Sequence, residues 1–261
     1  MAPERMRGSL RASEGLHMFD LIAALASLLT LVAYHYFLKL RQKRDPLYTV
    51  HAMNKLAREA WVDTIMRSEK PDVLAVQTLR NSVMASSFMA STAILLMVGA
   101  LSSAGYAEHP GSSVHALNLS GATNQQATAW KLVCLLVDFF VAFFCFAMSV
   151  RFYNHVGYMI GIPLQRKNST ISPGLVTAYL NRAGFFYLVG MRSFFYSVPL
   201  VFWMFGPLFM IVATLVLICA LFPLDRAPKA IISPHNVIAH DMQTRTSETQ
   251  EQLTARSAGR P

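Results

Sequence analysis

Four long apolar segments constrain the fold of this chain more than any other feature. They cover approximately Met18–Leu38, Val83–Gly105, Trp130–Phe152 and Phe195–Phe222. A helix needs about 20 residues to cross about 30 Å of hydrocarbon, and each segment reaches that length. The composition agrees, since 14% of the residues are charged, against about 25% in soluble domains. We therefore predict an all-α fold, an integral membrane four-helix bundle over residues 18–223.

Basic residues are distributed unevenly between the connections of this bundle. The connection Tyr106–Ala129 contains no Lys or Arg. The first connection contains nine: Lys39, Arg41, Lys43, Arg44, Lys55, Arg58, Arg67, Lys70 and Arg80. Short loops rich in Lys and Arg stay in the cytoplasm. The third connection, counted from Arg151 to Arg192, contains five basic residues and no acid. The pattern predicts that both basic connections lie inside and that both termini lie outside. These loops account for the net charge of +9, so we expect no nucleic-acid partner and instead contact with anionic lipid head groups.

The two ends of the chain differ from the apolar bundle. Residues 1–17 form an N-terminal extension whose arginines oppose an outside location, and Met18 is an alternative start of the protein. Residues 224–261 are polar and without hydrophobic periodicity. We expect this C-terminal segment to be a disordered tail, because it has too little apolar surface to form a core.

Two amphipathic elements are predicted at the cytoplasmic surface. The first covers about Thr49–Arg67, with a stripe formed by Met53, Leu56, Ala57, Ala60, Trp61 and Ile65. This stripe fits packing either on the membrane leaflet or on the bundle. The second lies within Gly161–Ser193, where Ser172 precedes Pro173 as a helix start. Arg182 and Arg192 within this helix make a full membrane crossing costly. We therefore expect the helix to lie at the surface and to lead into the fourth membrane helix.

Small residues four positions apart occur in the second membrane helix. The pairs are Ser86/Ala90 and Ser87/Ser91. Small residues at this spacing allow close approach of helices in lipid. We favour packing inside the bundle as the explanation, and a face for self-association is the alternative.

Asp138 is the main candidate for chemistry inside the membrane. It lies about eight residues into the third membrane helix, where an acid costs about 2.5–3.5 kcal/mol to insert. It should therefore face the interior, with Thr214 of the fourth helix at a similar depth. The open alternatives are a structural hydrogen bond of a protonated carboxyl group and a proton or cation relay.

Other chemistry has little support in the sequence. His35 and His155 end two different membrane helices, which would allow a haem, but the pair alone is weak evidence, and head-group contact or a simple polar cluster at the interface is the reading we favour. The motifs of common hydrolases, zinc proteases, P-loop enzymes and dinucleotide-binding domains are absent from the sequence. We therefore expect a protein that is not an enzyme and has no cofactor and no metal site.

Several segments together resemble a known family. They are NKLAREAW from Asn54, AVQTLRNSVMASSFMASTA from Ala75, RFYNHVGYMIGIP from Arg151 and GMRSFFYSVPLVFWMFGP from Gly190. This pattern resembles domain of unknown function 599, over about residues 18–223. The resemblance implies a four-helix architecture and a bacterial inner membrane location, and it implies no activity.

The same segments contain polar residues that we expect at one cytoplasmic level. These are Gln77, Arg80, Asn81, Arg151, Asn154, His155 and Arg192. Two interpretations are open, a polar collar that fixes the amphipathic elements to the bundle and a site for lipid phosphate. The function predicted from the sequence is a non-catalytic accessory, assembly or scaffolding subunit that binds other membrane subunits or itself. The alternative is a small oligomeric transporter or channel with Asp138 in its path.

Overall fold

The computed structural model describes residues 2–68, 73–107, 125–162 and 171–227. These ranges contain six helices: α1 (Ala2–Arg44), α2 (Val50–Arg67), α3 (Val73–Ala107), α5 (Gln125–Met159), α6 (Pro173–Phe205) and α7 (Pro207–Asp225). The described part of the chain has no strand, and its one β-type pairing is an isolated bridge between Thr49 and Arg226. The prediction of an all-α fold is confirmed.

Within the described residues the number of long apolar helices is five, so the prediction of four was wrong. All the helices except α2 are long and apolar enough to cross a membrane. The expected fourth segment, Phe195–Phe222, is divided at Gly206 between α6 and α7. Gly206 has φ 143° and ψ 161°, a conformation that is essentially confined to glycine. Pro207 follows at the first position of α7, where its missing N–H costs no hydrogen bond. The chain therefore reverses direction at a point where we expected a bend.

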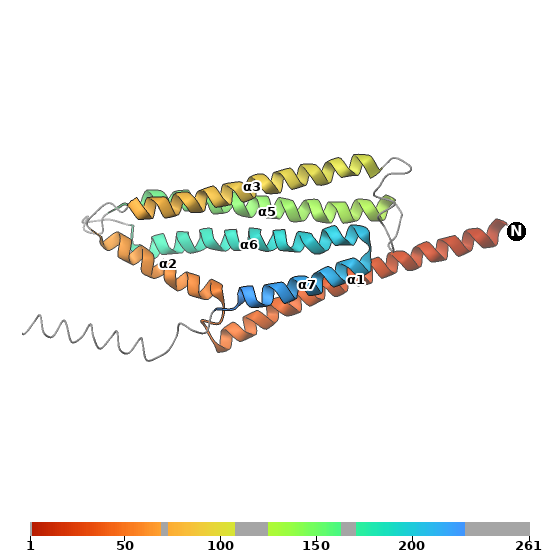
Figure 1. Cartoon of the computed structure of the whole chain (residues 1–261), viewed down its shortest axis with the longest axis horizontal. Coiled ribbons are helices and arrows are strands. Elements are labelled where there is room, and N and C mark those ends of the chain that lie inside the picture. Colours follow the sequence, from red (N-terminus) through yellow and green to blue (C-terminus); the bar gives the residue numbers. More distant parts are fainter. Residues whose placement is uncertain (1, 69–72, 108–124, 163–170, 228–261) are drawn as a thin grey trace, which may run out of the picture.

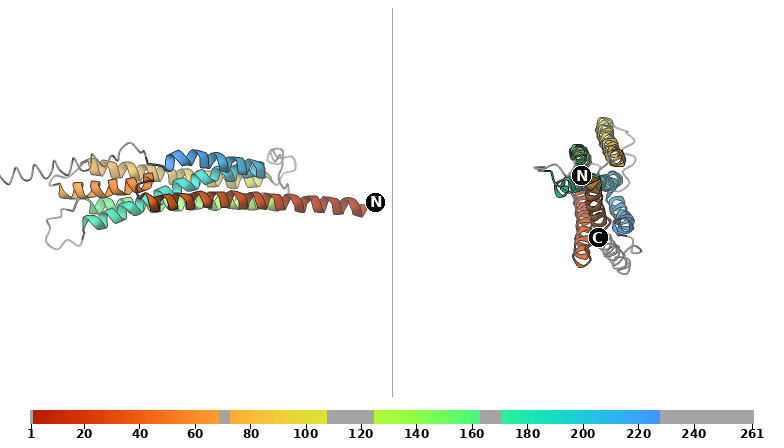
Figure 2. Two further views of the ribbon diagram at one scale, coloured as in Figure 1. Left: turned by 90° about the horizontal axis from the view of Figure 1, so that it is seen from below. Right: turned by 90° about the vertical axis from the view of Figure 1, so that its left-hand side faces the viewer.

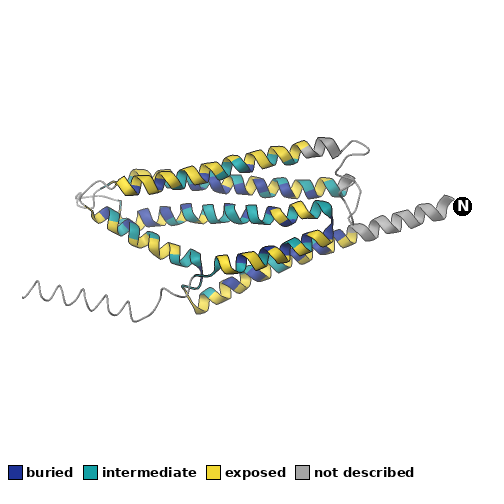
Figure 3. Cartoon of the chain, viewed as in Figure 1, coloured by how far each residue is buried: buried dark blue, intermediate teal, exposed yellow. Residues whose placement is uncertain are grey.

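The five long helices form an open row. The main contacts join α3 to α5, α5 to α6, α6 to α7, and α7 to α1. Figure 1 shows this order from one edge of the molecule to the other, and Figure 2 shows the same helices from below and end-on. Helices α3 and α1 form the two edges, and Figure 3 shows how much of the surface of α3 is exposed. The prediction of a bundle left open how its helices are arranged, and the structure places them in a row.

Helix α6 stands upright in this row, which means that it runs side by side with α5 over its whole length. It was expected to begin as a surface helix over Gly161–Ser193, and that prediction was wrong. Its packing against α5 explains the difference. The aromatic ring of Phe146 lies over Gly190, where an added Cβ atom would come within 2.9 Å of the ring. Nearby, Ser149 Oγ donates a hydrogen bond of 3.0 Å to the carbonyl oxygen of Ala183. Small residues thus let the two helices approach closely over several turns.

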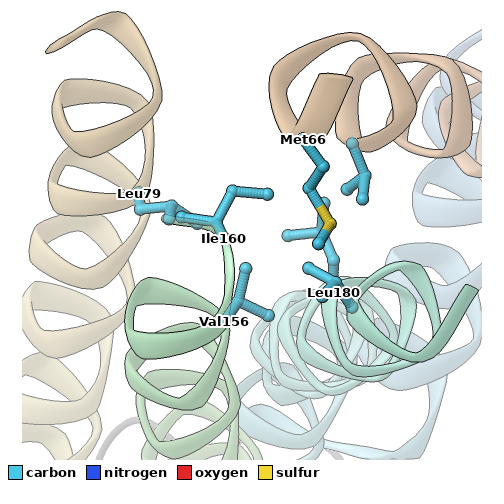
Figure 4. Close-up of a cluster of buried hydrophobic side chains, with 7 residues drawn as sticks. Met66, Leu79, Val156, Ile160 and Leu180 are labelled. Atoms are coloured by element: carbon cyan, nitrogen blue, oxygen red, sulfur yellow. The ribbon is translucent and has the colours of Figure 1, made fainter. Parts of the chain in front are cut away.

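A short helix packs across one end of the row. Val62 and Met66 of α2 are buried in a cluster that includes Leu79 of α3, Val156 of α5 and Leu180 of α6. Figure 4 shows these side chains converging from the four helices. The stripe predicted for α2 includes Leu56, Ala57 and Ala60, which are all exposed. Trp61 and Ile65 of the same stripe are half-buried and pack against the cluster. The helix therefore packs on the bundle with one side of the predicted stripe and leaves the other side outward.

The last turn of α7 lies at the same end of the molecule as α2. The backbone N–H of Ala227 donates to the carbonyl oxygen of Tyr48 over 2.9 Å, and the Arg226 guanidinium lies over the Tyr48 ring. We call this the basic end, because α1 reaches it with Lys39, Arg41, Lys43 and Arg44. The prediction placed the C-terminal side at the opposite end, and it was wrong because the chain runs along the row five times. Helix α7 extends two residues beyond the predicted boundary, and tail residues 228–261 lie outside the described residues.

The reversal at Gly206 gives a direct test of this fold. Gly206→Ala should lower the free energy of unfolding by about 2 kcal/mol, because the side chain would occupy a backbone region that costs about 1–3 kcal/mol. Thermal unfolding in detergent measures the change. Gly99→Ala is the matched control. Gly99 lies inside helix α3, and an added Cβ atom there would meet no atom within 4 Å. The control should be neutral or slightly stabilising, and equal destabilisation by both variants would contradict the assignment of the turn.

Candidate functional site

Polar side chains from three helices meet near the basic end. We name this set the polar cluster: Tyr34, His35, Arg192, Tyr196 and Asp225. The Arg192 guanidinium donates to Asp225 Oδ1 over 2.8 Å, and Tyr34 OH donates to Asp225 Oδ2 over 2.8 Å. Both carboxylate oxygens therefore have a partner. The cluster joins α1, α6 and α7, which otherwise contact each other through apolar side chains such as Leu38, Leu217 and Leu221.

His35 has a defined hydrogen-bonding arrangement within the polar cluster. Its Nδ1 lies 2.8 Å from the carbonyl oxygen of Leu31. A carbonyl oxygen only accepts, so Nδ1 carries the proton and Nε2 of the neutral ring accepts. Two donors face Nε2, the Arg192 guanidinium and Tyr196 OH, the latter at 2.8 Å. His155 lies elsewhere, exposed and with its ring centroid 6.0 Å from that of Tyr179. The two histidines that could have shared a haem therefore do not form one site.

The predicted polar collar does not form. Six of its members have exposed side chains: Gln77, Arg80, Asn81, Arg151, Asn154 and His155. The seventh, Arg192, belongs to the polar cluster. The reason is geometric, because Arg192 lies nineteen residues after the start of α6, about 28 Å along an upright helix. The collar required this part of α6 to lie flat at the surface, level with the ends of α3 and α5.

Asp138 makes its hydrogen bond with a different residue from the one we expected. Ser193 Oγ of α6 donates to Asp138 Oδ1 over 2.6 Å. Thr214 is buried on α7, and its hydroxyl donates over 2.8 Å to the carbonyl oxygen of Met210 in its own helix. The other carboxylate oxygen of Asp138 is buried without a hydrogen-bond partner in the described part of the chain. Asp138 thus faces the protein interior as predicted, on the contact between α5 and α6.

A second ion pair lies toward the opposite end of the row. Lys131 Nζ of α5 is 3.1 Å from Asp20 Oδ2 of α1, and the side chains are 4% and 7% exposed. The lysine also lies 5.4 Å from the centre of the Trp203 ring. The pair was not predicted from the sequence. Asp20 and Lys131 carry opposite charges near the starts of two apolar segments. Because buried charges are usually paired, these positions could have predicted the ion pair.

Two cavities adjoin the polar cluster. The polar pocket, about 550 Å³, lies between α1, α2, α6 and the end of α7, and its lining includes Arg58, Arg192 and His51. The apolar groove, about 680 Å³, lies between α1, α6 and α7, and its lining includes Leu28, Leu200 and Trp203. His35 and Lys39 line both cavities. The polar pocket and the apolar groove therefore meet at these two residues.

Comparison with known proteins identifies the family. A family model described as "Protein of unknown function, DUF599" matches residues 22–230. The chain belongs to the DUF599 family. This match confirms the resemblance seen in the sequence, although five long helices replace the four that the resemblance implied. Neither a curated protein nor a solved structure matches this DUF599 chain.

The polar cluster predicts a large effect of a single charge removal. Arg192→Leu leaves the Asp225 carboxylate without its cation, and breaking a buried pair costs about 3–5 kcal/mol. The two side chains keep 20% and 16% exposure, so we expect about 3 kcal/mol, measured by thermal unfolding in lipid nanodiscs. Arg182→Leu is the control, since Arg182 is on the same helix but is exposed and only stacks on Phe152. A loss below about 1 kcal/mol for both variants would show that the cluster does not stabilise the fold.

Proposed function

We propose that this protein is a non-catalytic accessory, assembly or scaffolding component of the bacterial inner membrane. In the proposed orientation the basic end faces the cytoplasm, since short segments rich in Lys and Arg stay inside. The C-terminal end of α7 then also lies inside, while α1 begins outside. This orientation revises the one expected from four crossings.

Labelling of single cysteines tests the proposed orientation. In a chain whose three cysteines have been replaced, Leu224→Cys and Lys43→Cys place a thiol at exposed positions of the basic end, and Met18→Cys places one on α1 far from it. A membrane-impermeant maleimide added to intact cells should label only the Met18→Cys protein. The other two should react after permeabilisation. Labelling of Leu224→Cys in intact cells would refute the orientation.

The observation that carries the proposed role is the outward face of the edge helix α3. Ser86 and Ala93 of α3 are buried, and Ser86 lies 3.3 Å from Ser149 of α5. Ser87 and Ser91, four residues apart, are exposed on a different side of α3, since Ser87 is turned about 100° from Ser86 around the helix axis. A helix with small polar residues on its free face can approach another membrane helix closely and form hydrogen bonds with it. The small residues of α3 thus support packing inside the bundle on the side of Ser86, and they support association with another helix on the side of Ser87 and Ser91.

The proposed role predicts an association that depends on this face. Native mass measurement of the tagged protein, extracted gently from its own membrane, should give a stoichiometric complex with a second copy or with another membrane chain. The double substitution Ser87→Leu and Ser91→Leu should weaken that association about tenfold, because leucine separates the helices and removes both hydroxyls.

Two small exposed residues of α1 provide the control for this experiment. Ala26→Leu with Ala33→Leu adds the same bulk to the other edge of the row, and the complex should persist. A wild-type protein that is monomeric and without a partner after gentle extraction would contradict the accessory role.

The transporter or channel alternative has less support. The second carboxylate oxygen of Asp138 lacks a hydrogen-bond partner among the described residues, a feature compatible with a proton relay. However, Asp138 lines neither the polar pocket nor the apolar groove. The accessory role is therefore the function that we propose.

A further inference from the structure

The polar pocket and the apolar groove together have the chemistry of one elongated site. The surface that lines the groove is almost entirely apolar, with Leu28, Val32 and Leu200 among its residues. It follows α1 from Ala24 to Lys39, about 22 Å at the rise of a helix. At the Lys39 end it adjoins the polar pocket, where the lining changes to charged and polar groups. A ligand that fills both cavities must have a long apolar part and a polar end.

The polar pocket carries an excess of positive charge. Its lining includes three cations, Lys39, Arg58 and Arg192, and one acid, Asp225. Asp225 is already engaged by Arg192 and Tyr34. Two cations of the lining therefore lack an acidic partner in that lining. A negatively charged group would balance them, and it would complete the charge pattern of the pocket.

Arg58 is the strongest indication of a missing anion. Its Nε donates to Asn181 Oδ1 over 2.8 Å, while Nη2 is buried without a hydrogen-bond partner in the described part of the chain. The guanidinium lies against the backbone of α6 at Gly184, where an added Cβ would come within 2.7 Å of Nη1. A buried donor without a partner costs about 1–3 kcal/mol, and more when charged. A guanidinium held in this way is suited to a phosphate oxygen.

His51 reports the same electrostatic environment. Burial lowers the pKa of its imidazole, and the neighbouring cations Arg58, Arg192 and Lys55 lower that pKa further. Burial also lowers the pKa of the Arg58 guanidinium. The shift at His51 has the sign expected where positive charge gathers in a partly buried pocket, and the shift at Arg58 has the sign expected from burial alone. An anion bound there would reduce this repulsion.

We propose that the joined cavities bind an anionic lipid, with its phosphate head group at Arg58 and Lys39 in the polar pocket and one acyl chain in the apolar groove. The lipid is the occupant we favour over free phosphate because the groove continues directly from the pocket, and a soluble anion would leave it unfilled. The volume of the groove, about 680 Å³, falls in the range of about 300–1,000 Å³ that is usual for ligand pockets. This site lies between α1 and α6, away from the outward face of α3.

Tryptophan fluorescence offers a native probe inside the groove. The protein has three tryptophans, Trp61, Trp130 and Trp203. Trp203 lines the groove, and Trp130 is 69% exposed on α5. A protein with Trp203 alone (Trp61→Phe, Trp130→Phe) reports groove lipid. A protein with Trp130 alone (Trp61→Phe, Trp203→Phe) reports the surrounding bilayer, and it is the matched control.

The experiment compares quenching by two brominated lipids in phosphatidylcholine vesicles. Brominated phosphatidylglycerol should quench Trp203 at a lower mole fraction than brominated phosphatidylcholine does, by about fivefold for each cation near the head group, about 1 kcal/mol each. Trp130 should be quenched equally by both. Arg58→Gln and Lys39→Gln should each remove about fivefold of the preference. Lys39 is exposed, so its substitution tests the site even if Arg58→Gln impairs folding.

Three results would overturn the proposal. Equal quenching of Trp203 by both lipids would mean that only unselected bilayer lipid enters the groove. A preference that survives in Lys39→Gln and in a folded Arg58→Gln protein would place the head group elsewhere. Loss of the preference on adding inorganic phosphate at constant ionic strength would identify a soluble anion as the occupant.

Discussion

The close approach of α5 and α6 is the interaction on which the rest of the structure depends. Phe146 packs directly over Gly190, and Ser149 reaches the backbone of α6 at Ala183. A larger residue at either α6 position would separate the helices, and packing in lipid depends on such small contacts because burial of apolar surface provides little driving force there. This contact holds α6 upright. An upright α6 in turn leaves α7 only one way to run, back along the row from Gly206.

The reversal at Gly206 determines which polar groups can meet. Arg192 and Asp225 are 33 residues apart in the chain, and Tyr34 and Asp225 are 191 apart. They come together because α7 returns to the level at which α1 ends. Each of these groups would be costly in an apolar environment without its partners. The polar cluster therefore couples the correct order of α1, α6 and α7 to the neutralisation of their charges.

The sequence predicted much of the fold and less of the site, for reasons that particular residues make clear. Long apolar runs located α1, α3 and α5, and Ser172 before Pro173 located the start of α6, where Leu175 N–H donates to Ser172 Oγ over 3.3 Å. The single run Phe195–Phe222 concealed two helices, because apolar composition is the same on both sides of a bend or a reversal. Asp225 follows that run after two residues and was assigned to the tail. Its partner could not be found without the reversal, so Arg192 was assigned to a collar with residues that the structure leaves exposed.

The one-residue turn between α6 and α7 also restricts how the molecule can move. With no loop between them, the two helices cannot slide past each other or separate at Gly206 without unwinding a helical turn. Any rearrangement of the pair must widen its other end, where Arg192 meets Asp225. Such widening would alter the polar pocket that both residues line and the groove beside it. The geometry of the turn thus converts relative motion of two membrane helices into a change of shape at a single place, on the side of the molecule where α2 packs.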